Sequence, residues 1–158
     1  MKSFSVKIFY SYSHQDEKYR DQMEKFLKLL QTQGLVEHWY DRKILAGQHI
    51  ERIIEDEIRS SDIVAFLISV DFLSSNACQK ELSLAKELAE QNGKKLISVI
   101  VRECPWQDHD SIAPYLATPR DGKAINTWQD EDEAWTYVYN DFKNVIMDLK
   151  KNFEVKED

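Results

Sequence analysis

Residues 62–90, DIVAFLISVDFLSSNACQKELSLAKELAE, contain the two patterns that decide the fold. Residues 63–70 form an almost unbroken apolar run, which is typical of a strand buried on both faces of a parallel sheet. We expect residues 72–76 to form a loop. From Asn76 the apolar positions recur as in an amphipathic helix, for which Ser75 or Asn76 is available as the N-cap. This stretch therefore predicts a strand, a loop and a helix of an α/β fold.

Glu81 is the candidate functional residue of this stretch. It lies in the second turn of the predicted helix, between the apolar positions Cys78 and Leu82. At 100° per residue it falls at the border of the buried face, close to the carboxyl end of the strand, where open α/β sheets bind ligands. The same position also suits an ordinary acidic residue, because the helix dipole favours negative charge near the N-terminus. Spacing alone leaves both interpretations open.

Strands and helices alternate along the rest of the chain, without a composition shift that would mark a second domain. The predicted strands are residues 5–13, 35–41, 63–70, 94–101 and, at the edge of the sheet, 123–128. The predicted helices are residues 17–33 with Asp16 as a cap and Gly34 at the end, 50–58, 76–92 with Gly93 at the end, and about 130–153.

The alternation predicts an α/β, flavodoxin-like fold, in which a five-stranded parallel sheet of order 2-1-3-4-5 has helices on both faces. This domain is expected to span residues 1–153, with 154–158 as a tail or the start of a linker to another domain. Residues 102–122 contain all three prolines, so we expect a loop there with one helical turn near 111–116.

Composition limits the class of protein. The 158 residues are 42% hydrophobic and 31% charged, as in an ordinary soluble globular domain. A net charge of -7 without a lysine or arginine cluster argues against direct nucleic-acid binding. We find no apolar run near the length of a membrane span, no leader-like start and only two cysteines. These features lead us to expect a cytoplasmic protein without a membrane partner.

Several chemistries lack their motifs. Three of the four glycines are explained by helix ends and a turn, so a glycine-rich phosphate loop is not available. The four histidines have no ligand spacing, and we expect no metal. A serine hydrolase would need a G-x-S-x-G motif. A phosphoreceiver domain would need acidic residues after the first strand, whereas Asp71 stands alone after the third.

The expected ligand crevice is lined by residues 12–15, 41–48 and 72–78, which follow the first three strands. Three stretches overlap these loops, and a fourth lies near the last helix. They are KIFYSYSHQDE from Lys7, WYDRKILAGQHI from Trp39, DIVAFLISVDFLSSNACQKEL from Asp62 and INTW from Ile125. In this order and spacing they resemble the TIR domain of the bacterial type. The resemblance covers about residues 6–153.

In TIR domains that cleave NAD+, the essential residue is a glutamate in a pattern like S-x-x-C-x-x-E. The resemblance implies this catalytic role for Glu81, since Ser75 and Cys78 match the rest of the pattern. It further implies contacts with the substrate at a larger set of positions. These are Tyr12, Ser13, His14, Asp41, Leu45, Gly47, Ala77 and Cys78.

A glutamate suits this chemistry because cleavage of the nicotinamide–ribose bond passes through an oxocarbenium-like state that a carboxylate stabilises. Nicotinamide leaves as a neutral group, so we expect NAD+ as the substrate and no added cofactor. The product would be ADP-ribose or a cyclic isomer of it.

The resemblance also implies partners. The loop at residues 41–48 would contact a neighbouring TIR domain, so the enzyme would be active in a homo-oligomer and weak as an isolated domain. Such a domain would serve as the effector of a bacterial antiviral defence protein whose sensor is another domain or chain.

The chain departs from the NAD+-cleaving pattern at two places. Many such members carry an aromatic residue four positions before the glutamate, where this chain has Ala77, and Trp106 and Tyr115 are the candidates for a replacement. Some members carry basic residues where this chain has Ser13 and His14. The alternative function is therefore a TIR interaction module without turnover. Ala77 favours that alternative, and Glu81 favours the enzyme.

Overall fold

The computed structural model describes residues 3–40 and 50–157. All strand pairs of the central sheet are parallel, in the order β2-β1-β3-β4-β5. The strands are β1 (Val6–Ser11), β2 (Val36–Tyr40), β3 (Ile63–Ile68), β4 (Lys95–Ile100) and β5 (Leu116–Thr118). The predicted flavodoxin-like order is confirmed.

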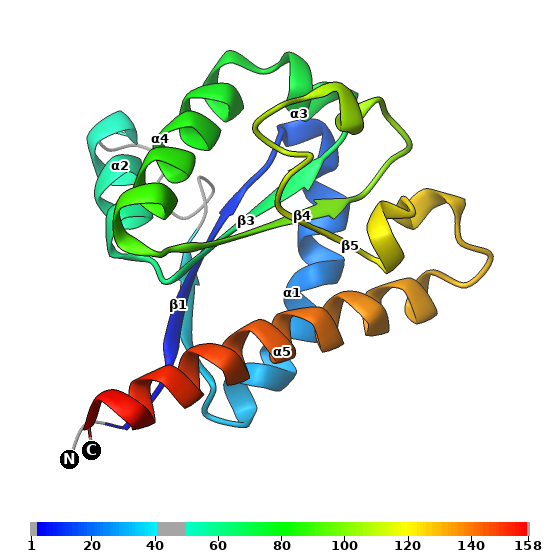
Figure 1. Ribbon diagram of the computed structural model, residues 1–158. Helices are drawn as coiled ribbons and strands as arrows, with labels where there is room; N and C mark the ends of the chain where they lie inside the picture. Colours follow the sequence, from blue (N-terminus) through cyan, green and yellow to red (C-terminus); the bar gives the residue numbers. More distant parts are fainter. Residues whose placement is uncertain (1–2, 41–49, 158) are drawn as a thin grey trace.

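Helices cover both faces of the sheet (Figure 1). The α-helices are α1 (Glu17–Thr32), α2 (Ile50–Ser60), α3 (Val70–Ser74), α4 (Asn76–Asn92) and α5 (Glu131–Glu157). Short 3-10 helices are η1 (His14–Asp16), η2 (Trp106–Asp108), η3 (Arg120–Gly122) and η4 (Ile125–Thr127). Helices α1 and α5 share one core with the sheet, and α2 and α4 share the other. Among residues 3–40 and 50–157, no helix is long and apolar enough to cross a bilayer.

Strand β3 lies at the centre of both cores, and all six of its residues are buried. Ile63, Ala65 and Leu67 belong to the α1–α5 core. Their neighbours Val64, Phe66 and Ile68 belong to the α2–α4 core. Successive side chains of a strand point to opposite faces, so a central strand covered on both sides needs an unbroken apolar run. This is why residues 63–70 are so informative.

The loop predicted at residues 72–76 is wrong in its first half, because α3 occupies it. Ser69 begins this helix, since its Oγ accepts a hydrogen bond of 3.1 Å from the backbone N–H of Phe72. The Phe72 side chain is buried and packs against Phe66 of β3. One buried aromatic anchor and one cap thus hold a single helical turn, which is too short for periodicity to reveal.

The predicted edge strand at residues 123–128 is also wrong. The fifth strand is β5, which pairs with β4 through Ile97–Leu116 and Val99–Thr118. Residues 123–128 instead contain η4, from which Ile125 is buried in the α1–α5 core. A three-residue strand carries no detectable alternation, so its pairing with β4 rather than local propensity selects it.

The predicted helix ends agree with the structure at some positions and differ from it at others. Gly34 and Gly93 end α1 and α4 with φ values of 77° and 72°, as predicted, because glycine adopts this left-handed conformation without strain. Asp16 occupies the predicted N-cap position of α1, but its side chain makes no capping hydrogen bond. Helix α5 continues through Glu157, past the predicted end at residue 153. The linker proposed for residues 154–158 stays a prediction.

Candidate active site

Glu81 is held in the second turn of α4 and is only 6% exposed. Its Oε1 accepts a hydrogen bond of 2.8 Å from the hydroxyl of Ser11, the fully buried last residue of β1. The helix begins where Ser75 Oγ accepts a hydrogen bond of 3.2 Å from the backbone N–H of Cys78, so Ser75 is the predicted N-cap. This start places Cys78 and Leu82 in the α2–α4 core and Glu81 against the carboxyl end of β1.

A pocket of about 650 Å³ lies between α2 and α4, with Glu81 in its wall. The described residues of its wall come from one face of each helix. They are Glu51, Ile54, Glu55 and Arg59 from α2, and Asn76, Ala77, Lys80, Glu81 and Leu84 from α4. The volume lies within the range of small-molecule sites, roughly 300–1,000 Å³. Because the described part of the wall holds three carboxylates and two cationic side chains, it suits a ligand that carries both signs of charge.

The structure brings only part of the predicted substrate site together. Ala77 lines the pocket beside Glu81, and its contact with the substrate stays a prediction. Cys78 is fully buried in the α2–α4 core and is not among the pocket residues. Its spacing from Glu81 therefore reflects the packing of α4 rather than a surface open to a ligand.

The predicted residues after β1 lie away from the pocket wall. Tyr12 is buried in the α1–α5 core. Ser13 Oγ accepts a hydrogen bond of 3.3 Å from the backbone N–H of Gln15 and so caps η1, while His14 is exposed. The substrate contacts predicted for these three residues stay predictions. Asp41, Leu45 and Gly47 lie outside the described residues.

Neither candidate for the missing aromatic platform lines the pocket. Trp106 is buried against Gly122, where a Cβ atom on the glycine would lie 2.2 Å from Trp106 Cζ2. Tyr115 packs against the same α2–α4 core as a half-buried side chain. In the described part of the chain, the pocket wall therefore has no aromatic residue.

Three residues of the site, Ser11, Arg59 and Lys80, are not predicted from the sequence pattern. Ser11 is signalled only by its place as the last residue of a buried strand, and its partner is 70 residues away. Arg59 shares a helix face with Glu51 and Glu55, a spacing that is visible in the sequence once α2 is assigned. Lys80 directly precedes Glu81 and could have been noticed as its cationic neighbour.

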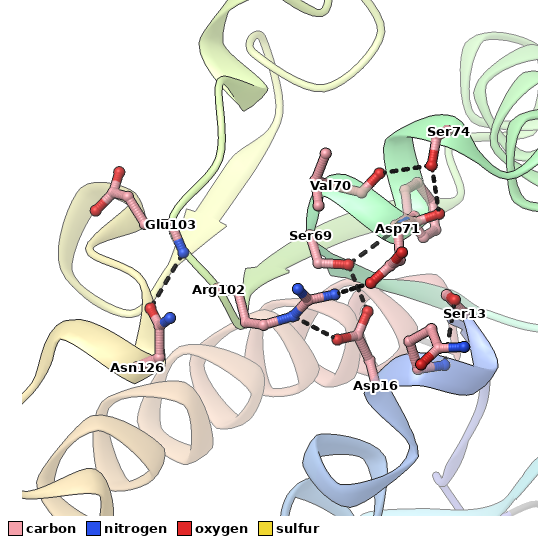
Figure 2. Close-up of polar contacts among 11 residues, drawn as sticks. Ser13, Asp16, Ser69, Val70, Asp71, Ser74, Arg102, Glu103 and Asn126 are labelled. Carbon is pink, nitrogen blue, oxygen red and sulfur yellow. Dashed lines mark hydrogen bonds and ion pairs between the residues drawn. The ribbon is translucent and has the colours of Figure 1, made fainter.

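A second polar cluster joins the loops that follow β1, β3 and β4 (Figure 2). Asp16 is fully buried, and its Oδ1 accepts a hydrogen bond of 2.8 Å from Arg102 Nε. The other carboxylate oxygen of Asp16 accepts a hydrogen bond from the hydroxyl of Ser69, and Arg102 Nη2 also pairs with Asp71. The hydrogen bond with Asp16 raises the pKa of the Arg102 guanidinium, against the opposing effect of its partial burial. Arg102 therefore stays charged and holds three loops together at the carboxyl edge of the sheet.

The chain is similar to known proteins over most of its length. The TIR_2 family model, described as TIR domain, matches residues 8–137. The chain is 44% identical over 132 residues to the uncharacterized protein y4lF of Sinorhizobium fredii (strain NBRC 101917 / NGR234). That match covers 83% of this chain and 41% of the relative, so the chain spans less than half the length of y4lF.

Three solved structures share the fold at low sequence identity. The TIR domains of the activated Roq1 resistosome, which recognises the pathogen effector XopQ, are 16% identical, with a TM-score of 0.66 and coverage of 87% of this chain and 99% of that one. The TIR domain of the Toll-related receptor TRR-2 from Hydra magnipapillata is 18% identical, with a TM-score of 0.57 and coverage of 89% and 98%.

The third structure is an enzyme. The CMP N-glycosidase BcmB of Clostridium botulinum is 14% identical, with a TM-score of 0.51 and coverage of 84% of this chain and 97% of that one. At these identities the three structures support the sheet order and helix arrangement described above. Together with the family match over residues 8–137, they show that the chain belongs to the TIR domain family.

Proposed function

We propose that this TIR domain is an NAD+ glycohydrolase that cleaves the bond between nicotinamide and ribose, with Glu81 as the catalytic carboxylate. The observation that carries the proposal is the position of Glu81. The residue is 6% exposed, its carboxylate is held by the 2.8 Å hydrogen bond from Ser11, and it lies in the wall of a pocket large enough for a nucleotide.

The chemistry needs few groups. As the bond from nicotinamide to ribose C1′ breaks, nicotinamide keeps the electron pair and leaves neutral, while positive charge develops on C1′ and the ring oxygen. A carboxylate held in a partly desolvated pocket stabilises this charge more strongly than one in water. Water then adds to C1′ and releases a proton, which gives ADP-ribose. Attack by the adenine or a ribose hydroxyl of the same molecule would give a cyclic isomer instead.

One structural neighbour supports a reaction of this class. BcmB is a CMP N-glycosidase by its title, and it shares the fold of this chain with a TM-score of 0.51. The fold is therefore compatible with cleavage of a bond between a ribose and a nitrogen base. The likeness concerns the fold alone, so the argument for NAD+ depends on Glu81, its pocket and the TIR family of the chain.

Nicotinamide release from NAD+ tests the proposal. The wild-type domain, Glu81→Gln and the control Glu87→Gln would be compared at high protein concentration and on a surface that forces clustering. Glu87 is an exposed carboxylate of the same helix, outside the pocket wall. We expect Glu81→Gln to lose about 100-fold or more in turnover, as for removal of a main electrostatic stabiliser, and Glu87→Gln to keep wild-type turnover. Equal rates for all three proteins would exclude the catalytic role of Glu81.

The second candidate function is a TIR interaction module without turnover. Ala77 favours it, because this side chain leaves the described pocket wall without an aromatic group that could stack on nicotinamide. If the clustered domain associates but releases no nicotinamide, this candidate replaces the enzyme. Rising turnover per domain with surface density would favour the enzyme.

The partners belong to the same proposal. Activation would require association with other copies through the loop at residues 41–48, which lies outside the described residues. A sensor domain or chain would bring the copies together in the bacterial cytoplasm during antiviral defence. No cofactor is needed, since NAD+ itself is consumed. Sedimentation of the domain with and without a deletion of 41–48 tests the role of this loop in assembly.

A further inference from the structure

In the described part of the chain, two cationic side chains line the Glu81 pocket, one from each helix. Arg59 lies in the last turn of α2, and Lys80 directly precedes Glu81 on α4. Both residues are exposed, and among the described residues neither side chain forms an ion pair or a hydrogen bond. Other cations of this domain, such as Arg20 and Arg102, are paired with carboxylates. The two cations of the pocket are therefore available to a ligand.

The other charges of the pocket limit which ligand fits. Glu51 and Glu55 line the wall opposite α4, and together with Glu81 they make three carboxylates against two cations among the described residues of the wall. A free anion such as inorganic phosphate would be repelled by this excess of negative charge. A ligand with a cationic ring at one part and a phosphate group at another would pair with both sets of side chains. An oxidised nicotinamide dinucleotide has this pattern, because its pyridinium ring is positive and its diphosphate carries two negative charges.

The order of Glu81 and Lys80 along α4 also matches the order of ribose and diphosphate in the dinucleotide. Lys80 is adjacent to Glu81 in the chain, and a single ribose separates the reacting C1′ of the nicotinamide nucleotide from the diphosphate. A carboxylate at the ribose would then have a cation within reach of the first phosphate. Arg59, on the facing helix, supplies a planar group that can donate two parallel hydrogen bonds to phosphate oxygens.

We propose that Lys80 and Arg59 bind the diphosphate of the dinucleotide and so make the domain select dinucleotides over nicotinamide nucleosides. The inference rests on the proposed function for its substrate, but it assigns a separate part of the pocket. The positive side chains would act on binding rather than on bond cleavage, because the diphosphate keeps its charge throughout the reaction.

The test compares two substrates in the clustered domain. NAD+ contains the diphosphate, whereas nicotinamide riboside has the same scissile bond and lacks it. The variants are Lys80→Gln and Arg59→Gln, with Lys86→Gln on α4 and Arg52→Gln on α2 as controls outside the pocket wall. We expect each pocket variant to raise KM for NAD+ about tenfold, the loss of one charge-assisted hydrogen bond, with little change in kcat. Turnover of nicotinamide riboside should not change, and the controls should match the wild type.

Two results would overturn the inference. One is an unchanged KM for NAD+ in the Lys80→Gln, Arg59→Gln double variant. The other is an equal loss of kcat/KM for NAD+ and for nicotinamide riboside, which would indicate damage to the pocket as a whole.

A binding experiment separates this inference from the proposed function. Titration calorimetry with ADP-ribose needs no turnover and can be done on the wild type and on Lys80→Gln. If no protein releases nicotinamide but Lys80→Gln weakens ADP-ribose binding about tenfold, the diphosphate site stands and the glycohydrolase proposal fails. If ADP-ribose binds both proteins equally or binds neither, the diphosphate site is excluded, whatever the outcome of the turnover assay.

Discussion

The hydroxyl of Ser11 donates a hydrogen bond of 2.8 Å to Oε1 of Glu81, although the two residues are 70 positions apart in the chain. Both side chains are buried. The contact joins the carboxyl end of β1 to the second turn of α4, and it orients the carboxylate beside the pocket between α2 and α4. It is the structural link between the fold of this domain and the chemistry that we propose for it.

Ser11→Ala should lower the free energy of unfolding by about 1–3 kcal/mol at pH 7, because a buried carboxylate loses a hydrogen-bond donor. Urea unfolding measures this change. The exposed Ser83→Ala on α4 serves as the control and should stay within about 0.5 kcal/mol of the wild type. In the Glu81→Gln background the effect of Ser11→Ala should be smaller, since the acceptor is then uncharged. Equal effects in both backgrounds would contradict the contact.

Asp16→Asn should destabilise the domain by about 1–3 kcal/mol, less than a fully buried pair would, because its partner Arg102 is 29% exposed. Asp21→Asn is the matched control, since Asp21 pairs with Arg20 but is 50% exposed. That change should cost less than about 1 kcal/mol. Thermal and urea unfolding of both variants test the comparison. If the two substitutions cost the same, the cluster in Figure 2 would be no stronger than a surface pair.

Gly122→Ala should be far more damaging than Gly34→Ala. Both glycines have positive φ, at 91° and 77°, so both substitutions strain the backbone by roughly 1–2 kcal/mol. Only at Gly122 would the new Cβ meet another group, at 2.2 Å from the ring of Trp106, whereas nothing lies within 4 Å at Gly34. We expect an additional cost of about 1–3 kcal/mol for Gly122→Ala. Equal melting temperatures for the two variants would contradict the packing of Trp106.

The thiol of Cys104 should be unreactive in the native protein. Burial raises its pKa, and a hydrogen bond with the backbone of Trp106 only partly opposes this effect. Because the thiolate is the reactive form, iodoacetamide at pH 7 should modify the folded domain at least about tenfold more slowly than the urea-unfolded chain. Mass spectrometry of the peptide that contains Cys104 gives both rates. Equal rates in the two states would show that the thiol is accessible and ionised.

Lys94 should make stability rise at alkaline pH. Burial lowers its pKa from 10.5, although the charge of Asp62 opposes the shift. Between the lowered folded value and 10.5, the unfolded chain therefore binds more protons than the folded one, and the free energy of unfolding increases with pH. The unfolding free energy of the wild type minus that of Lys94→Met should thus increase as pH rises towards 10.5. A flat or falling difference for Lys94→Met would contradict the shift.

The sequence predicts an element best where the residues of that element carry the signal, as apolar periodicity and cap residues do. The apolar run of β3 has the composition of a strand that is covered on both faces, and α4 begins at Ser75 and ends at Gly93, as its cap residues predict. Asp16 is the instructive failure. Its position before α1 suggests a cap, but its carboxylate is taken by Ser69 and Arg102, which are 53 and 86 positions away. A buried carboxylate gains more from a guanidinium and a hydroxyl than from a helix N-terminus that water can also solvate.

The sequence by itself determined the alternation of strands and helices and the helix that carries Glu81, because hydrophobic periodicity and cap residues act over a few neighbouring positions. The strand order followed from the fold class that this alternation predicts, and the TIR family from four motifs in their order along the chain. Only the tertiary structure decided that Ser11 meets Glu81, that β5 is Leu116–Thr118, and that Arg59 and Lys80 line the same pocket as the carboxylate. Such contacts depend on how strands and helices pack across the fold. Their energies come from pairs of residues that no local pattern in the chain connects.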